Sequence, residues 1–297
     1  MGPPGKHREY AIVEAPSPLG LRPTGVQDLA SALVRAGLAD RLNARRAGVV
    51  APSVYSAHRD PATNFLNPAA VVQHAIQLSN SVKSVLERGE FPLVLGGDCS
   101  ILLGNLLALK RRGRYGLLFI DGHTDFYQAD ANINGEIASS ELAIATGRGP
   151  RVLTHIDGEG PLIRDQDVVA FAFRDEQEAS KYGSQPLAPD ITAIDLATIR
   201  SSGIEAATSQ ALSRLTSTTQ GFWVHLDADA LDDAIMPAVD YRLEGGLSWE
   251  ELAVTLRMAL ATNHCVGLDV TIFNPHLDTD GAITRTFVDT LVEALKH

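Results

Sequence analysis

The chain has 297 residues, 21% of them charged, and a formal net charge of −11. Its hydrophobic content of 45% suits a globular protein with a large core, and the acidic balance argues against nucleic-acid binding. The two cysteines are too few for a disulfide framework, the N-terminal residues lack the apolar core of a signal peptide, and no apolar run approaches the roughly 18 residues of a membrane span. We therefore expect a cytoplasmic protein that binds neither nucleic acid nor membrane.

Short apolar runs alternate with stretches of helical periodicity along the chain. The runs that predict strands are 10–15, 47–51, 91–95, 115–120, 168–173, 191–194, 222–226 and 265–273. Helices are expected at 26–42, 68–88, 100–112, within 132–149 after Ser139 or Ser140, in two pieces within 177–219, after Ser248, and at 280–296. This alternation indicates a doubly wound parallel sheet. Because no repeat or linker interrupts it, we expect one domain spanning residues 1–297.

Acidic residues follow the fourth and the seventh predicted strands. Asp121, His123 and Asp125 occupy alternate positions, so on an extended chain they would share a face with about 7 Å between neighbours. Asp227 and Asp229 follow the later strand in the same way. Four gathered carboxylates repel one another unless a positive charge lies among them. The pattern predicts a divalent-metal site at the end of the sheet, in preference to ordinary loop carboxylates that bind backbone amides.

Three motifs together resemble the arginase/agmatinase (ureohydrolase) superfamily in order and spacing. They are Gly96-Gly97-Asp98-Cys99-Ser100, Asp121-Gly122-His123-Thr124-Asp125 and His225-Leu226-Asp227-Ala228-Asp229. The resemblance implies a three-layer α/β/α fold with a parallel sheet of about eight strands. It also implies a dinuclear metal centre, usually manganese, whose metal-bound hydroxide cleaves a linear C–N bond of a small guanidino or amidine-type substrate. Oligomers are common in this superfamily, so a homo-oligomer is compatible with the chain.

The expected metal ligands are Cys99, Asp121, His123, Asp125, Asp227 and Asp229. Asp121 and Asp227 are placed to bridge two ions. Asp125 and Cys99 would complete one ion's shell, and the remaining two residues would complete the other. Oxygen ligands suit Mn2+ or Mg2+, whereas the thiolate and the imidazole shift the preference toward Zn2+, Fe2+, Co2+ or Ni2+.

Two residues near these ligands are expected to have other roles. Asp98 should order its turn through hydrogen bonds to backbone amides rather than bind metal. His225 lies on the same strand face as the two aspartates that follow it, but deeper. It could either orient a ligand or simply pack in the core.

Four positions depart from the superfamily pattern. Cys99 replaces the usual histidine, and its thiolate would bring the site to five negative charges against four from two divalent ions, giving a weaker Lewis acid or a half-filled site. Ala138 replaces a histidine that transfers protons. Ile272 replaces a glutamate that binds the guanidinium group, and Tyr241-Arg242 replaces a Thr-Pro pair.

These departures decide which other residues could serve the reaction. Asp125 and Glu136 are the predicted catalytic residues, with Glu141 or a water as further sources of the leaving-group proton. Guanidinium recognition would fall to Glu136, Glu141 or Asp240, although a surface or helix-cap role is the favoured interpretation of Glu141. Arg242 could bind a substrate carboxylate or lie on the rim.

Because a proton donor is missing, the substrate should have a poorly basic leaving group, such as an N-hydroxy or N-acyl nitrogen. The cysteine-bearing relatives of the arginases that hydrolyse hydroxyarginine fit this expectation. Two alternatives stay open: a catalytically weak relative that acts as a metal-dependent binding or regulatory protein, and a mononuclear amidohydrolase.

Overall fold

The computed structural model describes residues 8–296, so most of the N-terminal stretch considered for a signal peptide lies outside the described residues. Eight parallel strands form one sheet in the order β2-β1-β3-β8-β7-β4-β5-β6. The strands are β1 Tyr10–Glu14, β2 Arg45–Val49, β3 Phe91–Leu95, β4 Gly116–Ile120, β5 Val168–Phe171, β6 Thr192–Ile194, β7 Phe222–Asp227 and β8 Cys265–Thr271. The parallel, eight-stranded sheet predicted from the sequence is thereby confirmed.

Eleven α-helices connect the strands within the described range. They are α1 Leu29–Arg35, α2 Leu38–Leu42, α3 Pro68–Glu87, α4 Leu102–Lys110, α5 Glu141–Ala145, α6 Arg151–Thr154, α7 Glu176–Lys181, α8 Leu196–Ser202, α9 Ile204–Thr218, α10 Trp249–Ala261 and α11 Ala282–Lys296. Ser248 caps α10 as predicted, because its side chain and that of Glu251 exchange hydrogen bonds with each other's backbone amides. Pro68 occupies the first turn of α3, where its missing N–H costs no helical hydrogen bond.

Three helix predictions were wrong. The stretch 177–219, expected to contain two helical pieces, contains α8, α9 and most of α7. The single helix expected over 26–42 is broken at Gly37, whose φ of 93° lies in the left-handed region that glycine adopts without strain. Ser140 precedes α5 but makes no capping hydrogen bond with its side chain. Its hydroxyl instead accepts a hydrogen bond from Asn132.

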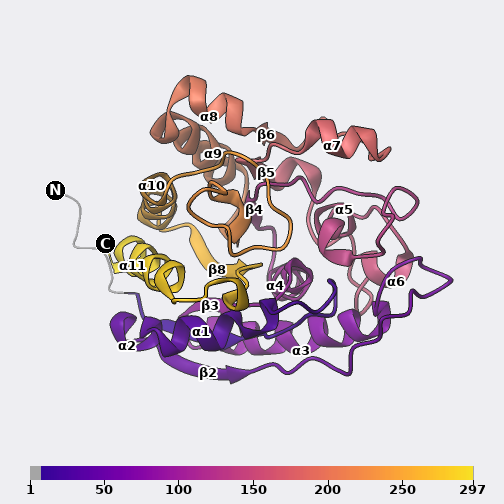
Figure 1. Ribbon diagram of the computed structural model, residues 1–297, viewed down its shortest axis with the longest axis horizontal. Helices are drawn as coiled ribbons and strands as arrows, with labels where there is room; N and C mark the ends of the chain where they lie inside the picture. Colours follow the sequence, from indigo (N-terminus) through magenta and orange to yellow (C-terminus); the bar gives the residue numbers. More distant parts are fainter. Residues whose placement is uncertain (1–7, 297) are drawn as a thin grey trace.

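The sheet lies between two layers of helices (Figure 1). Alternate side chains of its strands enter two separate hydrophobic clusters. One cluster contains residues of α1, α2, α9, α10 and α11, and the other contains residues of α3, α4, α5 and α6. This is the expected three-layer α/β/α arrangement, in which strands covered on both faces are apolar throughout. No helix within residues 8–296 is long and apolar enough to cross a membrane.

The carboxyl ends of four neighbouring strands provide the setting for the candidate site. Strands β3, β8, β7 and β4 are adjacent in the sheet and parallel. The chain therefore leaves all four at the same edge, and the loops that follow them meet there. Open α/β sheets generally bind their ligands outside this edge.

Candidate metal centre

The turn after β3 places Cys99 at the start of a short helical segment. The side chain of Asp98 accepts a hydrogen bond from the backbone amide of Ser100 at 2.8 Å, which fixes this turn. Gly97 packs directly on Ser17, whose carbonyl oxygen would lie only 2.0 Å from a Cβ at this position. The prediction that Asp98 orders the turn is confirmed. The ordered turn fixes the position of the Cys99 backbone.

The loop after β4 is compact rather than extended. One carboxylate oxygen of Asp121 accepts the amide hydrogen of His123 at 2.6 Å, and the amide of Gly122 donates to Asp229 at 3.0 Å. Asp125 has a φ of 42°, in the left-handed region. Our expectation of side chains aligned along an extended chain was therefore wrong. The side chains of Asp121, His123 and Asp125 nevertheless lie close together, because the loop bends back on itself.

The loop after β7 is fixed by its own carboxylate and by a half-buried arginine. Asp227 accepts the backbone amide of Asp229 at 2.7 Å. The guanidinium group of Arg174 donates to the carbonyl oxygens of Asp229, Leu243 and Glu244 at 2.9, 3.1 and 3.1 Å. These bonds tie the loop to the segment that precedes α10, and they also place a positive charge behind the site.

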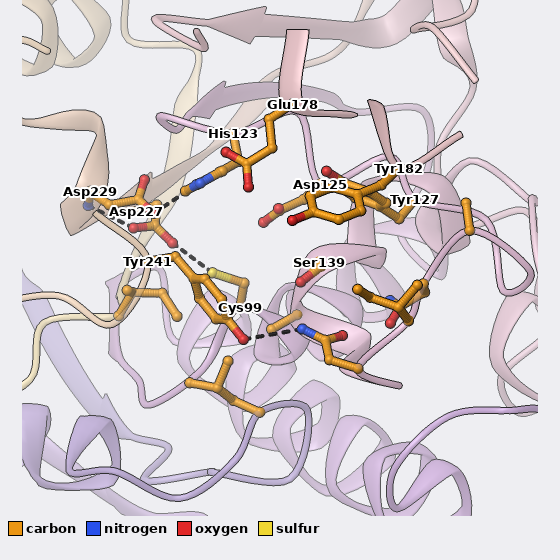
Figure 2. Close-up of a pocket in the computed structure, with 17 residues that line it drawn as sticks. Cys99, His123, Asp125, Tyr127, Ser139, Glu178, Tyr182, Asp227, Asp229 and Tyr241 are labelled. Carbon is orange, nitrogen blue, oxygen red and sulfur yellow. Dashed lines mark hydrogen bonds and ion pairs between the residues drawn. The ribbon is translucent and has the colours of Figure 1, made fainter. Parts of the chain in front are cut away.

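The structure brings the six predicted ligands together at one cavity of about 180 Å³, and Figure 2 shows the five that line it. Nδ1 of His123 lies 2.9 Å from Oδ2 of Asp229, and Sγ of Cys99 lies 2.8 Å from Oδ2 of Asp227. Asp121 lies beneath the cavity, with a carboxylate oxygen within 4.8 Å of the ligand atoms of His123 and Asp229. Five of the six line the cavity: Cys99, His123, Asp125, Asp227 and Asp229.

The cluster contains more negative groups than the protein neutralises. Burial raises the pKa of Asp121, Asp125 and Asp227 well above the ordinary range, and repulsion between neighbouring carboxylates raises it further. Burial and the adjacent Asp227 also raise the pKa of the Cys99 thiol. Its proton accordingly stays on sulfur and is donated to Asp227 until a cation replaces it.

His123 and Asp229 form an ion pair at the cavity wall. Burial alone would lower the pKa of His123, but the Asp229 carboxylate outweighs burial and raises it to about 9. For Asp229 burial opposes ionisation, and the imidazolium lowers its pKa below the usual value. The same two side chains can release the proton and bind a cation through Nδ1 and Oδ2.

Glu141 joins this cluster, contrary to the prediction that it is a surface or cap residue. Its side chain is completely buried next to the carboxyl group of Asp125, and no other described group donates a hydrogen bond to its oxygens. The prediction failed because α5 packs with its first residue toward the sheet edge, which the local sequence does not specify. The available signal was a single acid at the start of the apolar run Leu142–Ala145.

The donor atoms fit divalent cations. The ligand atoms of Cys99, Asp121, Glu141 and His225 lie within 4.8 Å of one another, and those of Asp121, His123 and Asp229 form a second such group. Among the described residues, buried oxygens of Asp121 and Glu141 have no hydrogen-bond partner. A buried unpaired polar atom costs about 1–3 kcal/mol. Cations shared between the two groups would satisfy these atoms and neutralise the carboxylates.

Residues 11–296 match the family model described as the arginase family. The chain belongs to the arginase family. It is 28% identical to an arginase from Bacillus caldovelox over 278 residues, which cover 91% of this chain and 92% of that protein. It is also 28% identical to an arginase from Bacillus subtilis (strain 168) over 305 residues, covering 97% of both chains.

Solved structures of the arginase family superimpose on the chain over nearly its whole length. The native structure of arginase from Bacillus caldovelox aligns with a TM-score of 0.87 and 25% identity, covering 98% of this chain and 99% of that one. Arginase from Bacillus cereus aligns with a TM-score of 0.85 and 26% identity, with the same coverage. The resemblance inferred from the three motifs is confirmed, as is the fold that it implied.

Four residues that depart from the arginase-family pattern line the cavity: Cys99, Ala138, Tyr241 and Ile272. Ala138 and Ile272 both line the cavity. Both substitutions therefore change the side chains that face the cavity. Ile272 has a φ of 67°, an unusual conformation for a β-branched residue. Its amide donates to the carbonyl of Gly97 at 2.9 Å, which holds this conformation next to the turn that carries Cys99.

The carboxylate of Glu136 accepts hydrogen bonds from other groups of the protein. It accepts hydrogen bonds from the amide of Arg22 at 3.2 Å, from Asn134 Nδ2 at 2.7 Å and from the Tyr241 hydroxyl at 2.5 Å. Asn134 and Tyr241 line the cavity, whereas Glu136 lies behind them. A catalytic role for Glu136 stays a prediction.

Arg242 and Asp240, the other candidates for substrate recognition, are also engaged elsewhere. The exposed Arg242 forms a two-point ion pair with Asp233, at 2.5 and 2.9 Å. Asp240 accepts a hydrogen bond from Asn274 at 2.9 Å. Neither residue lines the cavity. Of the two roles considered for Arg242, the surface location is the one that the structure supports.

Proposed function

We propose that the protein is a hydrolase that cleaves a linear C–N bond of a guanidino, N-hydroxyguanidino or related amidine or amide compound with two divalent cations, Mn2+ foremost. The observation that carries the proposal is the convergence of the six predicted ligands from three separate strand ends on one cavity. Membership of the arginase family and the similarity to bacterial arginases support the same reaction class.

The cations would be held by the six predicted ligands, and when bound they lower the pKa of a shared water and polarise the trigonal carbon. Asp125 faces the cavity close to Asp227 and Asp229. Its carboxylate is placed to orient the attacking water, to take a proton from it, and to pass that proton to the leaving nitrogen. Glu136, the other residue predicted to be catalytic, would act as a positioning residue that holds Asn134 and Tyr241 in the cavity wall.

The cavity wall favours a planar substrate that is neutral or positively charged. No lysine or arginine occurs among the lining residues, whereas Glu178 and Asp125 contribute negative charge. Tyr127, Tyr182 and Tyr241 line the same cavity and offer both aromatic surface and hydroxyl groups. A guanidinium or amidinium group matches this combination because it is flat, cationic and rich in hydrogen-bond donors.

The proposal is tested by measuring product release together with bound metal. Protein loaded with Mn2+ should release urea, hydroxyurea or ammonia from at least one member of a panel of guanidino, hydroxyguanidino and amide compounds. Asp227→Ala should lose metal binding and turnover together. Asp289→Asn, a change at an exposed residue paired with Arg41, is the matched control and should retain both. Full activity in Asp227→Ala would refute the mechanism.

A second function is a catalytically weak arginase relative that binds a ligand in a metal-dependent way. The observation that favours it is the presence of Ala138 and Ile272 in the cavity wall, where relatives have a proton donor and a guanidinium partner. Isothermal calorimetry distinguishes the two functions: this alternative predicts metal-dependent binding of a guanidino compound with no product released over hours. Elemental analysis addresses the mononuclear alternative, which predicts one ion per chain.

A further inference from the structure

The imidazole of His225 is held in one orientation by a carboxylate on the adjacent strand. His225 on β7 and Asp269 on β8 are direct register partners, and Nδ1 of His225 lies 2.6 Å from Oδ2 of Asp269. The other oxygen of Asp269 accepts hydrogen bonds from Asn105, at 3.0 Å, and from the Trp223 indole. The ring stacks on Phe119 with a centroid distance of 4.8 Å. Both side chains of the pair are completely buried.

These contacts decide which ring nitrogen has the free lone pair. The carboxylate of Asp269 accepts hydrogen bonds at both oxygens, so Nδ1 of His225 carries the hydrogen that faces it. Nε2 is therefore the ring nitrogen whose lone pair is available to a cation, and no described residue hydrogen-bonds to it. A histidine whose outer nitrogen is held by a carboxylate is the usual arrangement of a metal-binding imidazole.

The lone pair of His225 faces acceptors rather than donors. The nearest charged atom is Oδ2 of Asp121, at 3.9 Å, which is likewise without a partner among the described residues. The carboxyl group of the buried Glu141 contacts that of Asp125, and no other described group donates a hydrogen bond to its oxygens. Two acceptors at this distance repel each other, whereas a cation bonded to both at about 2.0–2.2 Å would join them.

We propose that His225 and Glu141 are metal ligands that, together with Cys99 and Asp121, hold the deeper cation of the pair. One donor atom from each of these four buried residues lies within 4.8 Å of the others. The outer cation would be held by His123 and Asp229, and Asp121 belongs to both groups. Asp125 and Asp227 stay ligands of the pair, as proposed above. This assignment rests on the proposal that cations bind in the cavity, and it adds two ligands that the sequence motifs did not provide.

The proposed ligand set gives the two positions different chemistry. The deeper position has a thiolate, an imidazole and two carboxylates and should prefer Zn2+, Fe2+ or Co2+, whereas the outer position is closer to the cavity and has one imidazole and carboxylates. The neutral imidazole adds no charge to the already acidic site. Asp269 acts as a positioning residue for His225, because it touches the ring and not the proposed cation.

Metal stoichiometry and affinity in single variants test the assignment without measuring turnover. Co2+-loaded wild type should contain two ions per chain after gel filtration. His225→Gln and Glu141→Gln should each retain only the outer ion, and Asp269→Asn should weaken the deeper ion by about 10–100-fold. His74→Gln is the matched control: His74 is also buried, but its Nε2 lies 3.0 Å from the Val50 carbonyl, outside the site, so both ions should remain.

The outcomes separate this inference from the proposed function. If His225→Gln and Glu141→Gln fold and keep both ions at wild-type affinity, the inference is overturned while the metal site stands. If the wild type binds no ion, the proposed function fails as well. X-ray absorption at the zinc edge of wild type loaded with Zn2+ instead of Co2+ provides a measurement that does not depend on variant folding. It should show two imidazoles and one sulfur, the latter at about 2.3 Å, per pair of ions, and a single imidazole would refute the assignment.

Discussion

The sulfur of Cys99 and a carboxylate oxygen of Asp227 lie 2.8 Å apart, joining the turn after β3 to the end of β7. Because burial and Asp227 raise the pKa of the thiol, cation binding must displace its proton. Cys99→Ser should reduce the affinity for Cd2+ or Zn2+ at least about tenfold more than the affinity for Mn2+, since a hydroxyl is a harder ligand than a thiolate. Competition titrations with a chromophoric chelator measure both affinities. Equal losses for the soft and hard ions would show that sulfur is not a ligand.

Ala138 occupies the position where relatives have a proton-transferring histidine, and it lines the cavity. Ala138→His should raise kcat about tenfold or more for substrates with a basic amine leaving group, within the range of general acid catalysis. Substrates that release hydroxylamine should gain little, because that leaving group needs less protonation. Paired assays on a guanidine and its N-hydroxy derivative compare the two. A gain of the same size for both substrates would contradict the role assigned to this position.

Glu136 holds Asn134 and Tyr241 in the cavity wall through hydrogen bonds of 2.7 and 2.5 Å. If this support is its main contribution, Glu136→Gln and Tyr241→Phe should both raise KM severalfold and change kcat less than about threefold. Steady-state kinetics across pH distinguish this outcome from direct proton transfer. A large fall in kcat for Glu136→Gln alone, with a lost ionisation in the pH profile, would instead identify Glu136 as the proton donor.

The stability of the cation-free protein should fall as the pH rises from 7 to 9. Interaction with Asp229 outweighs burial and raises the pKa of His123 to about 9, from an ordinary value of 6.5. Between these values the folded state binds more protons than the unfolded state, so the free energy of unfolding decreases with pH. The raised pKa values of Asp121, Asp125 and Asp227 act in the same direction above about pH 4.

Thermal melting in EDTA and in excess Mn2+ measures this dependence. The Tm in EDTA should fall over this range, and the increase given by Mn2+ should grow, because deprotonated ligands bind the cation more tightly. His123→Asn, which removes the titrating ring, should flatten the EDTA curve. A Tm in EDTA that rises with pH would contradict the charge imbalance inferred for the site.

The alternation of apolar runs and helical stretches was enough to predict the layers and the parallel sheet. The convergence of the candidate ligands was predictable because acids directly after buried strands must meet at one sheet edge. What periodicity could not show was the left-handed conformation of Gly37 that divides a predicted helix, or the compact loop that contains Asp125.

The burial of Glu141 and the partner of His225 could not be predicted because both depend on contacts between distant segments. Glu141 reaches the site only because α5 packs at the edge of the sheet. The sequence could not decide whether His225 packs in the core or orients a ligand. Strand periodicity predicts which face of the sheet a side chain lies on, but not which side chain of the next strand it contacts. The neighbour of His225, Asp269, is 44 residues away in sequence and becomes adjacent only through the register of β7 and β8.

The central claim is that this cavity holds a pair of cations, and an anomalous-scattering map of crystals grown with Mn2+ tests it most directly. The account predicts two manganese peaks about 3.5–4 Å apart, with Asp121 between them and Cys99 sulfur bonded to the deeper one. A map in which the cavity contains no anomalous peak, while Mn2+ binds only at the surface, would contradict it.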